Sequence, residues 1–323
     1  MAMGVALLLV LGGRSTNAAP AFNAPNDVSA IEQIEATIQS ATDMKKIIDY
    51  YAPNAVVLDI YAPGIYRGRK QIMAGFQPQL ATIKSMTDNM SEMNVASDGR
   101  FACAAMQIGF KTLLKNGKSV AMSVREIDAF KKIQGKWMIV QQHISLPADP
   151  KTGMAVVNGP IKSYGPLAWS ASPLPGPATT PTQAKQEIHN WMQVGAVSTS
   201  LNQLMQYYGP GNDVIVYDSY YPGELRGLKA IRNNYAAVMS NIKNSHMTMP
   251  LFVADSDGLF GVQIDIQDLT LTMRHGGTQK LALRQSDCMR RVGGKWYSFF
   301  EMISFPVDAK TGKAIMVSSP ATH

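Results

Sequence analysis

The sequence predicts an α+β protein built from two copies of one domain. Its 323 residues suit two domains of 100–200 residues each. Residues 59–153 align without a gap to residues 218–312, at a constant offset of 159, with 28 of 95 positions identical. Within each copy, helical patterns come first and long β-prone runs follow. Helices segregated from a meander of strands indicate an α+β fold rather than an alternating α/β fold.

The repeat also sets the domain boundaries. Asp59–Ile72 matches Asp218–Ile231, and upstream Tyr50–Pro53 matches Tyr207–Pro210 at an offset of 157. A period this long is that of a whole domain rather than of a solenoid unit. We expect a signal peptide at 1–21, domains at 27–158 and 182–317, and a Pro/Gly-rich linker at 159–181 between them.

The first part of each copy reads as helical. Ser29, followed by Glu32, matches a capping box, and Ile31, Ile34 and Ile38 follow at helical spacing. Thr182 opens the equivalent helix of the second copy. We expect a short helix over 43–51 that ends before Pro53, a strand over 55–60, and a helix over 69–84 that Pro78 kinks or ends.

The later part of each copy reads as strands. In the first copy, Asn116-Gly117 is a strong hairpin signal between two long β-prone runs. A third run follows the turn at Gln134-Gly135. The expected strands are Phe101–Leu114, Ser119–Ile133 and Lys136–Ser145. They predict a long antiparallel meander with the helices on one face.

The net charge of +7 is spread thinly over the chain. Residues 27–160 carry +3 and residues 181–323 carry +2. Nucleic-acid-binding proteins concentrate their positive charge on one face or helix, so we expect no nucleic-acid partner. The longest apolar run, Val5–Leu11, is far shorter than the roughly 20 residues that span a bilayer. We therefore expect no membrane association once a signal peptide is removed.

The N-terminus resembles a secretory signal peptide. An apolar stretch within Met1–Gly13 precedes small residues, and Ala19-Pro20-Ala21 fits an A-x-A cleavage pattern. The alternative is a disordered or mis-started N-terminus, because no basic residue precedes the apolar stretch. Export would place the protein in the periplasm or outside the cell. Cys103 and Cys288 occupy non-equivalent positions of the two copies, so we expect two buried free thiols rather than a disulfide.

The end of the first meander carries a family resemblance. It reads Gly135-Lys136-Trp137, then His143, then Ser145-Leu146-Pro147. With the upstream Asp59, Pro63, Arg67-Gly68 and Arg125-x-Ile127, this resembles the SnoaL-like branch of the nuclear transport factor 2 / ketosteroid isomerase superfamily. The resemblance implies two tandem cone-shaped α+β barrels (cystatin-like or NTF2-like), each with helices packed on a curved antiparallel sheet. The superfamily hosts isomerases, cyclases and non-catalytic domains, so the resemblance specifies the fold more than the function.

Asp59 and Asp218 are the first candidate site residues, because each ends an apolar strand beside Tyr61 or Tyr220. A carboxylate at the mouth of an apolar cone has its pKa raised by desolvation, which suits proton transfer. The resemblance implies the same acid–base role. The competing interpretation is that Asp59 fixes the following turn or pairs with Arg67.

Arg125 and Asp128, like Arg284 in the second copy, lie on the central strand. A spacing of three places Arg125 and Asp128 on opposite faces of the sheet. We consider Arg125 and Arg284 as ligands for an anion inside the cone, against a structural salt bridge.

His143 shares strand parity with Trp137, Ile139 and Gln141, so it is either a second catalytic candidate or a packed, hydrogen-bonded residue. Met302 replaces it in the second copy, Ile266 replaces Gln107 and Leu225 replaces Tyr66. Gln107 and Tyr66 are therefore further candidates for ligand binding. If one copy alone binds a polar ligand, these positions favour the first.

The sequence shows no histidine pair at metal-binding spacing, no Walker loop and no dinucleotide fingerprint. We expect neither a cofactor nor a metal ion. Two functions remain open: binding of a small apolar or amphipathic molecule, and a cofactor-free isomerase or cyclase using Asp59. A purely structural or interaction module is a further alternative. We also expect the copies to pack as an intramolecular pseudo-dimer in a monomeric chain.

Overall fold

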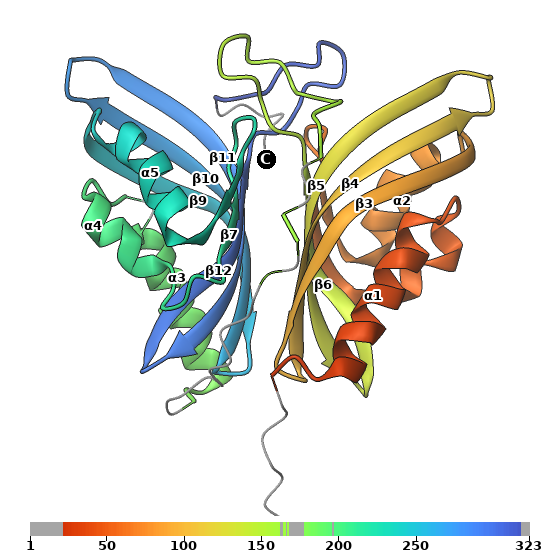
Figure 1. Cartoon of the computed structure of the whole chain (residues 1–323), viewed down its shortest axis with the longest axis horizontal. Coiled ribbons are helices and arrows are strands. Elements are labelled where there is room, and N and C mark those ends of the chain that lie inside the picture. The colour runs from red at the N-terminus through yellow and green to blue at the C-terminus, as the bar shows by residue number, and fades with distance from the viewer. Residues whose placement is uncertain (1–21, 162–163, 166, 168–177, 196, 318–323) are drawn as a thin grey trace, which may run out of the picture.

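The computed structural model describes residues 22–161, 164, 165, 167, 178–195 and 197–317. It contains two sheet–helix units with the same order of elements (Figure 1). The predicted signal peptide lies outside the described residues. No helix within the described ranges is long and apolar enough to cross a membrane.

The first unit contains α1 (Pro25–Gln39), η1 (Met44–Lys46), η2 (Ile48–Tyr50), β1 (Tyr51–Leu58), β2 (Ile65–Arg67), α2 (Gly68–Leu80), β3 (Ile83–Ser97), β4 (Phe101–Leu114), β5 (Ser119–Ile133) and β6 (Lys136–Ser145). The second contains α3 (Pro181–Gly195), α4 (Leu201–Leu204), η3 (Met205–Tyr207), β7 (Ile215–Tyr217), β8 (Glu224–Arg226), α5 (Gly227–Met239), β9 (Ile242–Ser256), β10 (Phe260–Met273), β11 (Thr278–Val292) and β12 (Lys295–Ser304).

The three predicted strands of the first meander are confirmed with the bounds of β4, β5 and β6. Three local predictions are wrong. Helix α1 begins at Pro25 with Ala24 as its N-cap, so Ser29 does not cap it. The short helix after Asp43 is a pair of 3₁₀ turns, and the strand after it begins at Tyr51, before Pro53. A further long edge strand, β3, follows α2 and was not predicted.

The expected α+β fold, with helices packed on a curved sheet in each of two units, is confirmed. Each sheet is open rather than closed into a barrel, and it contains one parallel pair of strands beside the antiparallel ones. The strand orders are β2-β1-β6-β5-β4-β3 and β8-β7-β12-β11-β10-β9. β1 pairs with β6, and β7 with β12, in parallel, while the other pairs are antiparallel. Register shifts at Met90/Met93 and at Ala129/Phe130 bend the first sheet, as bulges do. The result in each unit is a curved sheet with helices on one face.

The two sheets meet through the faces that the helices leave uncovered (Figure 1). A continuous apolar cluster joins Cys103, Ile127 and Ala129 of the first unit to Val262 and Phe300 of the second. Both faces of each sheet are therefore buried. This explains why the first six residues of β4 and the first eight of β10 are buried without alternation.

Reciprocal hydrogen bonds show a pseudo-twofold relation between the units. Ala155 N donates to Gly312 O, and Ala314 N donates to Gly153 O, both at 2.9 Å. Ala155 and Ala314 are equivalent positions of the two copies, as are Gly153 and Gly312, so the two hydrogen bonds are the same contact made in both directions. Such an exchange is the signature of an isologous interface, in which position i contacts position j and j contacts i.

The prediction of two free thiols is wrong, because Cys103 and Cys288 form a disulfide with Cα atoms 6.4 Å apart. In the second unit Cys103 corresponds to Val262, and in the first Cys288 corresponds to Ala129. In a twofold interface, a position of one unit generally faces a different position of the other unit. Cys103 and Cys288 can therefore be bridged although they are not equivalent.

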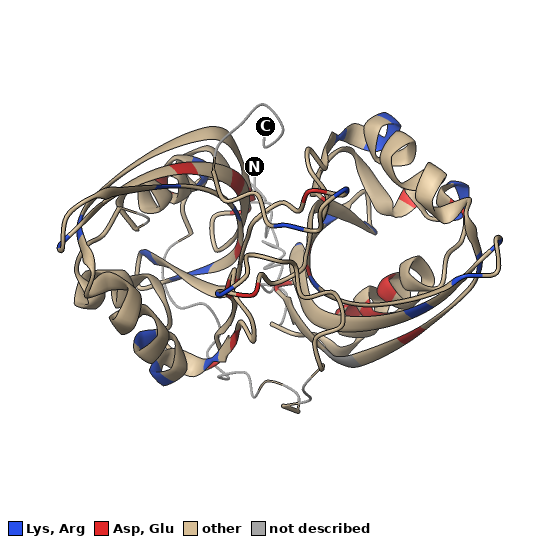
Figure 2. Ribbon diagram, turned by 90° about the horizontal axis from the view of Figure 1, so that it is seen from above, with Lys and Arg blue, Asp and Glu red and all other residues tan. Residues whose placement is uncertain are grey.

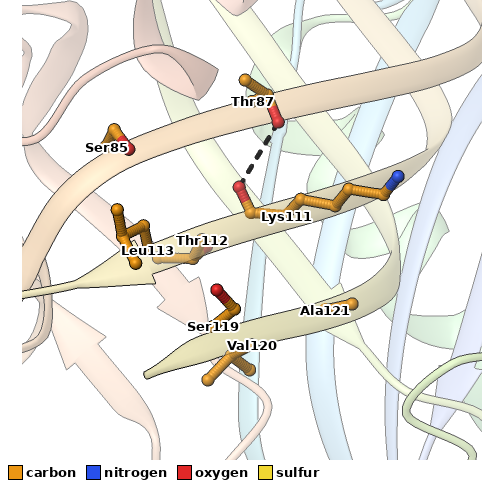
Figure 3. A pocket seen from close by; sticks show the side chains of 8 residues that line it. All are labelled: Ser85, Thr87, Lys111, Thr112, Leu113, Ser119, Val120 and Ala121. Carbon is orange, nitrogen blue, oxygen red and sulfur yellow. Dashed lines mark hydrogen bonds between the residues drawn. The ribbon is translucent and has the colours of Figure 1, made fainter. Parts of the chain in front are cut away.

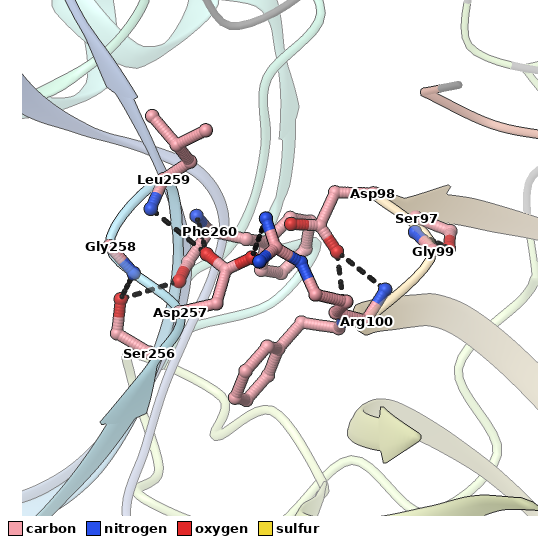
Figure 4. A network of polar contacts seen from close by, with 10 residues as sticks. Ser97, Asp98, Gly99, Arg100, Ser256, Asp257, Gly258, Leu259 and Phe260 are labelled. Carbon is pink, nitrogen blue, oxygen red and sulfur yellow. Dashed lines mark hydrogen bonds and ion pairs between the residues drawn. The ribbon is translucent and has the colours of Figure 1, made fainter. Parts of the chain in front are cut away.

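The turns of β3–β4 and β9–β10 bring two aspartates together at the interface (Figure 4). Arg100 forms an ion pair with Asp257 at 2.8 Å. Asp98 is buried, and its desolvation and the neighbouring Asp257 raise its pKa to about 7. The remaining Lys and Arg residues are scattered over both units rather than gathered on one face (Figure 2).

Candidate functional site

Each unit holds a cavity of about 220 Å³ between its helices and its sheet. The cavity of the first unit is lined mainly by Met, Phe, Ile and Leu side chains from α1, α2, β4 and β5. Its polar lining consists of Gln39, Tyr51, Asp59, Gln79, Thr112, Glu126 and Gln142. An apolar cavity with a few convergent polar groups is the usual form of a small-molecule site.

Asp59 lines this cavity at the end of β1, as the sequence predicted. Its Oδ1 accepts a hydrogen bond from Ile60 N at 2.8 Å, and its Oδ2 accepts one from Tyr66 Oη at 3.3 Å. Burial raises the pKa of Asp59, and these hydrogen bonds and the charge of Arg284 oppose that effect. Asp59 N also donates to Gly64 O at 2.7 Å, so the same residue fixes the turn. The contact with the turn matches the structural interpretation of Asp59, and its acid–base role stays a prediction.

Tyr66 and Tyr61 lie near Asp59 but do not line the cavity. The Tyr66 ring covers Gly75 and packs edge-on against Phe76, with ring centroids 5.4 Å apart. Burial and the Asp59 charge raise the pKa of Tyr66 to about 12, so its hydroxyl stays a donor. Tyr61 instead forms a β-bridge with Val307 of the second unit.

A cluster of three carboxyl groups, which the sequence analysis did not select, lies under the cavity. Ligand oxygens of Glu35, Glu126 and Asp128 lie within 4.8 Å of one another, and all three residues are buried. Gln142 Nε2 donates to Glu126 at 2.6 Å and to Asp128 at 3.1 Å, and its Oε1 accepts from Tyr51 Oη at 2.9 Å. Neither carboxylate oxygen of Glu35 meets a hydrogen-bond donor among the described residues.

Burial raises the pKa of each of these three carboxyl groups well above its usual range, and their mutual repulsion adds to the effect. Three buried carboxylates need neutralising charge, because an isolated buried ion costs many kcal/mol. Protons supply it when the groups are carboxylic acids. An oxygen-only set of this kind also suits a hard cation such as Ca²⁺ or Mg²⁺. Glu126 lines the cavity and connects the cluster to it.

His143 lies outside the cavity, in the interface between the units. It is fully buried; its Nδ1 lies 3.1 Å from Ser286 Oγ and its Nε2 lies 2.8 Å from Ser304 Oγ. Burial and the charges of Arg284 and Arg125 lower its pKa well below the usual value, so the ring is neutral. The geometry therefore matches the packed, hydrogen-bonded alternative.

A bulge explains the misplacement of His143. In the β5–β6 pairing, Ala129 faces Gln141 but Phe130 faces Ile139, so Val140 is an extra residue. This extra residue shifts the alternation of side chains by one, so odd-numbered residues before and after it face opposite sides of the sheet. Trp137 and Ile139 face the core of the first unit, whereas Gln141 donates to Val253 O of the second unit at 3.0 Å.

Arg125, Arg284 and Gln107 also lie in the interface, which corrects their expected place inside the cone. Gln107 Nε2 donates to Glu224 of the second unit. The guanidinium groups of Arg125 and Arg284 bind backbone carbonyls of the opposite unit. The expected opposition of Arg125 and Asp128 across the sheet is observed, but Asp128 is the residue that points inward.

In the second unit, Asp218 and Tyr220 both line the cavity. Asp218 accepts hydrogen bonds from Ser219 N at 2.7 Å and from Asn234 Nδ2 at 2.9 Å. This cavity is also lined by Gln267, Gln285 and Glu301, and Tyr235 donates to Glu301 at 3.2 Å. The second cavity is therefore polar as well, and the residues that distinguish the copies in sequence do not make the first more polar.

Two further hollows lie on the outer strands. One of about 390 Å³ lies where β3, β4 and β5 run out beyond the helices, and Lys111 is the only charged residue in its lining (Figure 3). Another of about 600 Å³ lies beside it, against Asn158–Ile161. Neither contains a buried polar cluster.

A family model described as a SnoaL-like domain matches residues 29–149. The first unit is therefore similar to a SnoaL-like domain over those residues. No curated protein matches the chain. All residues that line the first cavity lie within 29–149.

Solved structures similar to parts of the chain include three bacterial proteins. A putative calcium/calmodulin dependent protein kinase II association domain from Xanthomonas campestris is 27% identical, with 42% of this chain and 94% of that chain covered and a TM-score of 0.34. An NTF2-like protein of unknown function from Pseudomonas putida is 19% identical (43% and 95% covered, TM-score 0.36). An NTF2-like superfamily protein from Salmonella enterica is 23% identical (40% and 98% covered, TM-score 0.35).

Proposed function

We propose that this chain is an exported protein of two tandem SnoaL-like domains that binds a small apolar or amphipathic molecule in the cavity of each. Residues 1–21 are its signal peptide, 27–158 and 182–317 its domains, and 159–181 its linker. The first cavity carries the proposal: an apolar lining converges on Asp59, Glu126 and Gln142. The disulfide supports export, because such bridges persist in oxidising compartments.

Binding is tested with N-phenyl-1-naphthylamine, a neutral apolar fluorophore whose N–H can donate to a carboxyl group. Val124 and Leu283 line the two cavities at equivalent positions. We expect wild-type protein to bind two molecules, and Val124→Trp and Leu283→Trp to lose one each by filling one cavity. Equal binding by wild type and the doubly filled variant would place the probe elsewhere and refute the proposal.

A second function is acid–base catalysis on a carbon acid with Asp59 as the base. The observation in its favour is that Asp59 lines the cavity with a pKa raised by burial, beside the donor Tyr66. The test is the exchange of the α-protons of cyclohexanone in D₂O, followed by NMR. Asp59→Asn should abolish any acceleration while the protein stays folded, and Asp218→Asn serves as the matched variant. Unchanged exchange in Asp59→Asn would remove Asp59 from the reaction.

A further inference from the structure

Arg125 and Arg284 stand at equivalent positions, and each points away from the cavity of its own unit. On β5, Glu126 and Asp128 face inward, and Arg125 faces the second sheet. Both arginines are almost completely buried, with 3% and 2% of their surface exposed. Neither has a partner carboxylate among the ion pairs of the described residues.

Each guanidinium binds the turn that carries the other unit's cavity aspartate. Arg284 donates to the backbone carbonyl of Asp59, and its Nη2 donates to Pro63 O at 2.6 Å. Arg125 donates to the carbonyl of Asp218, and its Nη2 donates to Ser145 Oγ at 3.1 Å. The exchange is reciprocal, as the pseudo-twofold relation requires.

The turns are shaped to admit the arginine. In the second unit, Gly223 has φ +66° and lies so close that a Cβ atom there would be 2.7 Å from Arg125 Nη1. Gly64, the equivalent residue in the first unit, has φ +42°. A left-handed conformation without a side chain lets the turn approach the guanidinium.

We infer that each unit supplies an arginine that positions the cavity aspartate of the other: Arg284 positions Asp59, and Arg125 positions Asp218. The inference rests on the proposed binding function, which it deepens by making each cavity depend on the opposite unit. The charge matters as well as the contact. Arg284 acts on the Asp59 carboxyl group across the interface and lowers its pKa against the effect of burial. Two separated domains would each lack this part of their site.

The main test uses the full-length chain with ¹³C-labelled aspartate and follows the Asp59 carboxyl signal during a pH titration. Arg284→Gln should raise the pKa of Asp59, and Arg284→Lys should restore part of the change because it keeps the charge. Arg125→Gln is the matched control, since it removes an equivalent buried arginine that contacts the other turn; it should leave the Asp59 titration unchanged.

A binding measurement adds a second readout. In the Leu283→Trp background, where only the first cavity is open, Arg284→Gln should weaken N-phenyl-1-naphthylamine binding about tenfold, the value of one charged hydrogen bond. If Arg284→Gln and Arg125→Gln lower the melting temperature alike and neither changes the Asp59 titration, the arginines only join the units and the inference fails. Absence of probe binding in wild type would refute the proposed function, and the titration would still decide the role of Arg284.

Discussion

The interiors of the two units differ in how their buried carboxyl groups are hydrogen-bonded. In the first, Gln142 donates to Glu126 and to Asp128, and Glu35 meets no hydrogen-bond donor among the described residues. In the second, Asp287 accepts hydrogen bonds from Gln263, Gln285 and Ser298, at 2.6, 2.8 and 2.6 Å. Two other buried acids have donors as well, because Asp265 accepts from Gln267 and Glu301 accepts from Tyr235, both at 3.2 Å.

This difference shows that one fold can hold buried acids both with and without side-chain hydrogen-bond donors. A carboxylate surrounded by donors is stabilised in place, whereas one without donors must take up a proton or a cation. Burial raises the pKa of Asp265 and of Glu301 in the second unit as well, so the two interiors differ in their hydrogen-bond donors rather than in the presence of acids with raised pKa values. Gln285 and Met192 stand in the second unit where the first has Glu126 and Glu35, whereas Asp265 and Glu301 stand where the first has Met106 and Gln142, so each interior has acids that the other lacks.

The largest expected effect comes from removing the disulfide that joins the two units. Replacing both cysteines (Cys103→Ala with Cys288→Ala) should cost about 2–5 kcal/mol of unfolding free energy, since the bridge closes a long loop. Calorimetry should then show two transitions, because each unit has its own core. A thiol assay on wild-type protein is the control and should find no reactive thiol. If the double variant then melted in a single transition at the wild-type temperature, the disulfide would not stabilise the protein as expected.

Exchanging single acids should move stability in opposite directions in the two units. Asp287→Asn should cost about 1–3 kcal/mol, because its amide group would face hydrogen-bond donors. Glu35→Gln should instead stabilise the protein at pH 8, since it removes a buried acid that has no donor. Urea denaturation at fixed pH measures both. The same sign for the two variants would show that the interiors do not differ as described.

The smallest effect concerns pH and the aspartate pair between the units. Asp98 has a raised pKa of about 7, so the folded protein holds a proton that the unfolded chain has released above about pH 4. Unfolding free energy should therefore fall as pH rises from 5 to 8. Asp98→Asn should reduce this fall in unfolding free energy by about 1 kcal/mol. The charged groups that face Asp98 are Asp257 and Arg100.

The control for this pH experiment is Asp149→Asn. Hydrogen bonds from Thr152 and Lys151 lower the pKa of Asp149, so that residue does not contribute to a fall above pH 5. A pH profile of Asp98→Asn that matched wild type would place the proton elsewhere.

The sequence predicted the repeat and the three meander strands because both depend on local signals: matched segments, and turns such as Asn116-Gly117. It misplaced Arg125 because both faces of β5 are buried. Apolar residues flank both parities of that strand, so alternation cannot show which face lines the cavity. His143 was misplaced by one bulge residue, Val140, which no local pattern marks.

Asp59 was predictable, since a carboxyl group after an apolar strand and before a Pro-Gly turn is a local feature. Glu35 was not selected, because the isoleucines of α1 appeared to define the buried stripe. The buried residues of α1 are in fact Ile31, Glu35 and Gln39, at a spacing of four. An acid at that spacing from a buried isoleucine is the signal that could have identified it.

The disulfide also changes what proteolysis can do to the molecule. The peptide chain joins the two units once, through residues 159–181, and the Cys103–Cys288 bridge joins them a second time. A protease that cut the connector would leave two polypeptides joined by the disulfide. Arg125 and Arg284 could then still contact the turn of the opposite unit. In an oxidising environment the two halves would therefore stay covalently joined after such a cut, in addition to the apolar contacts between them.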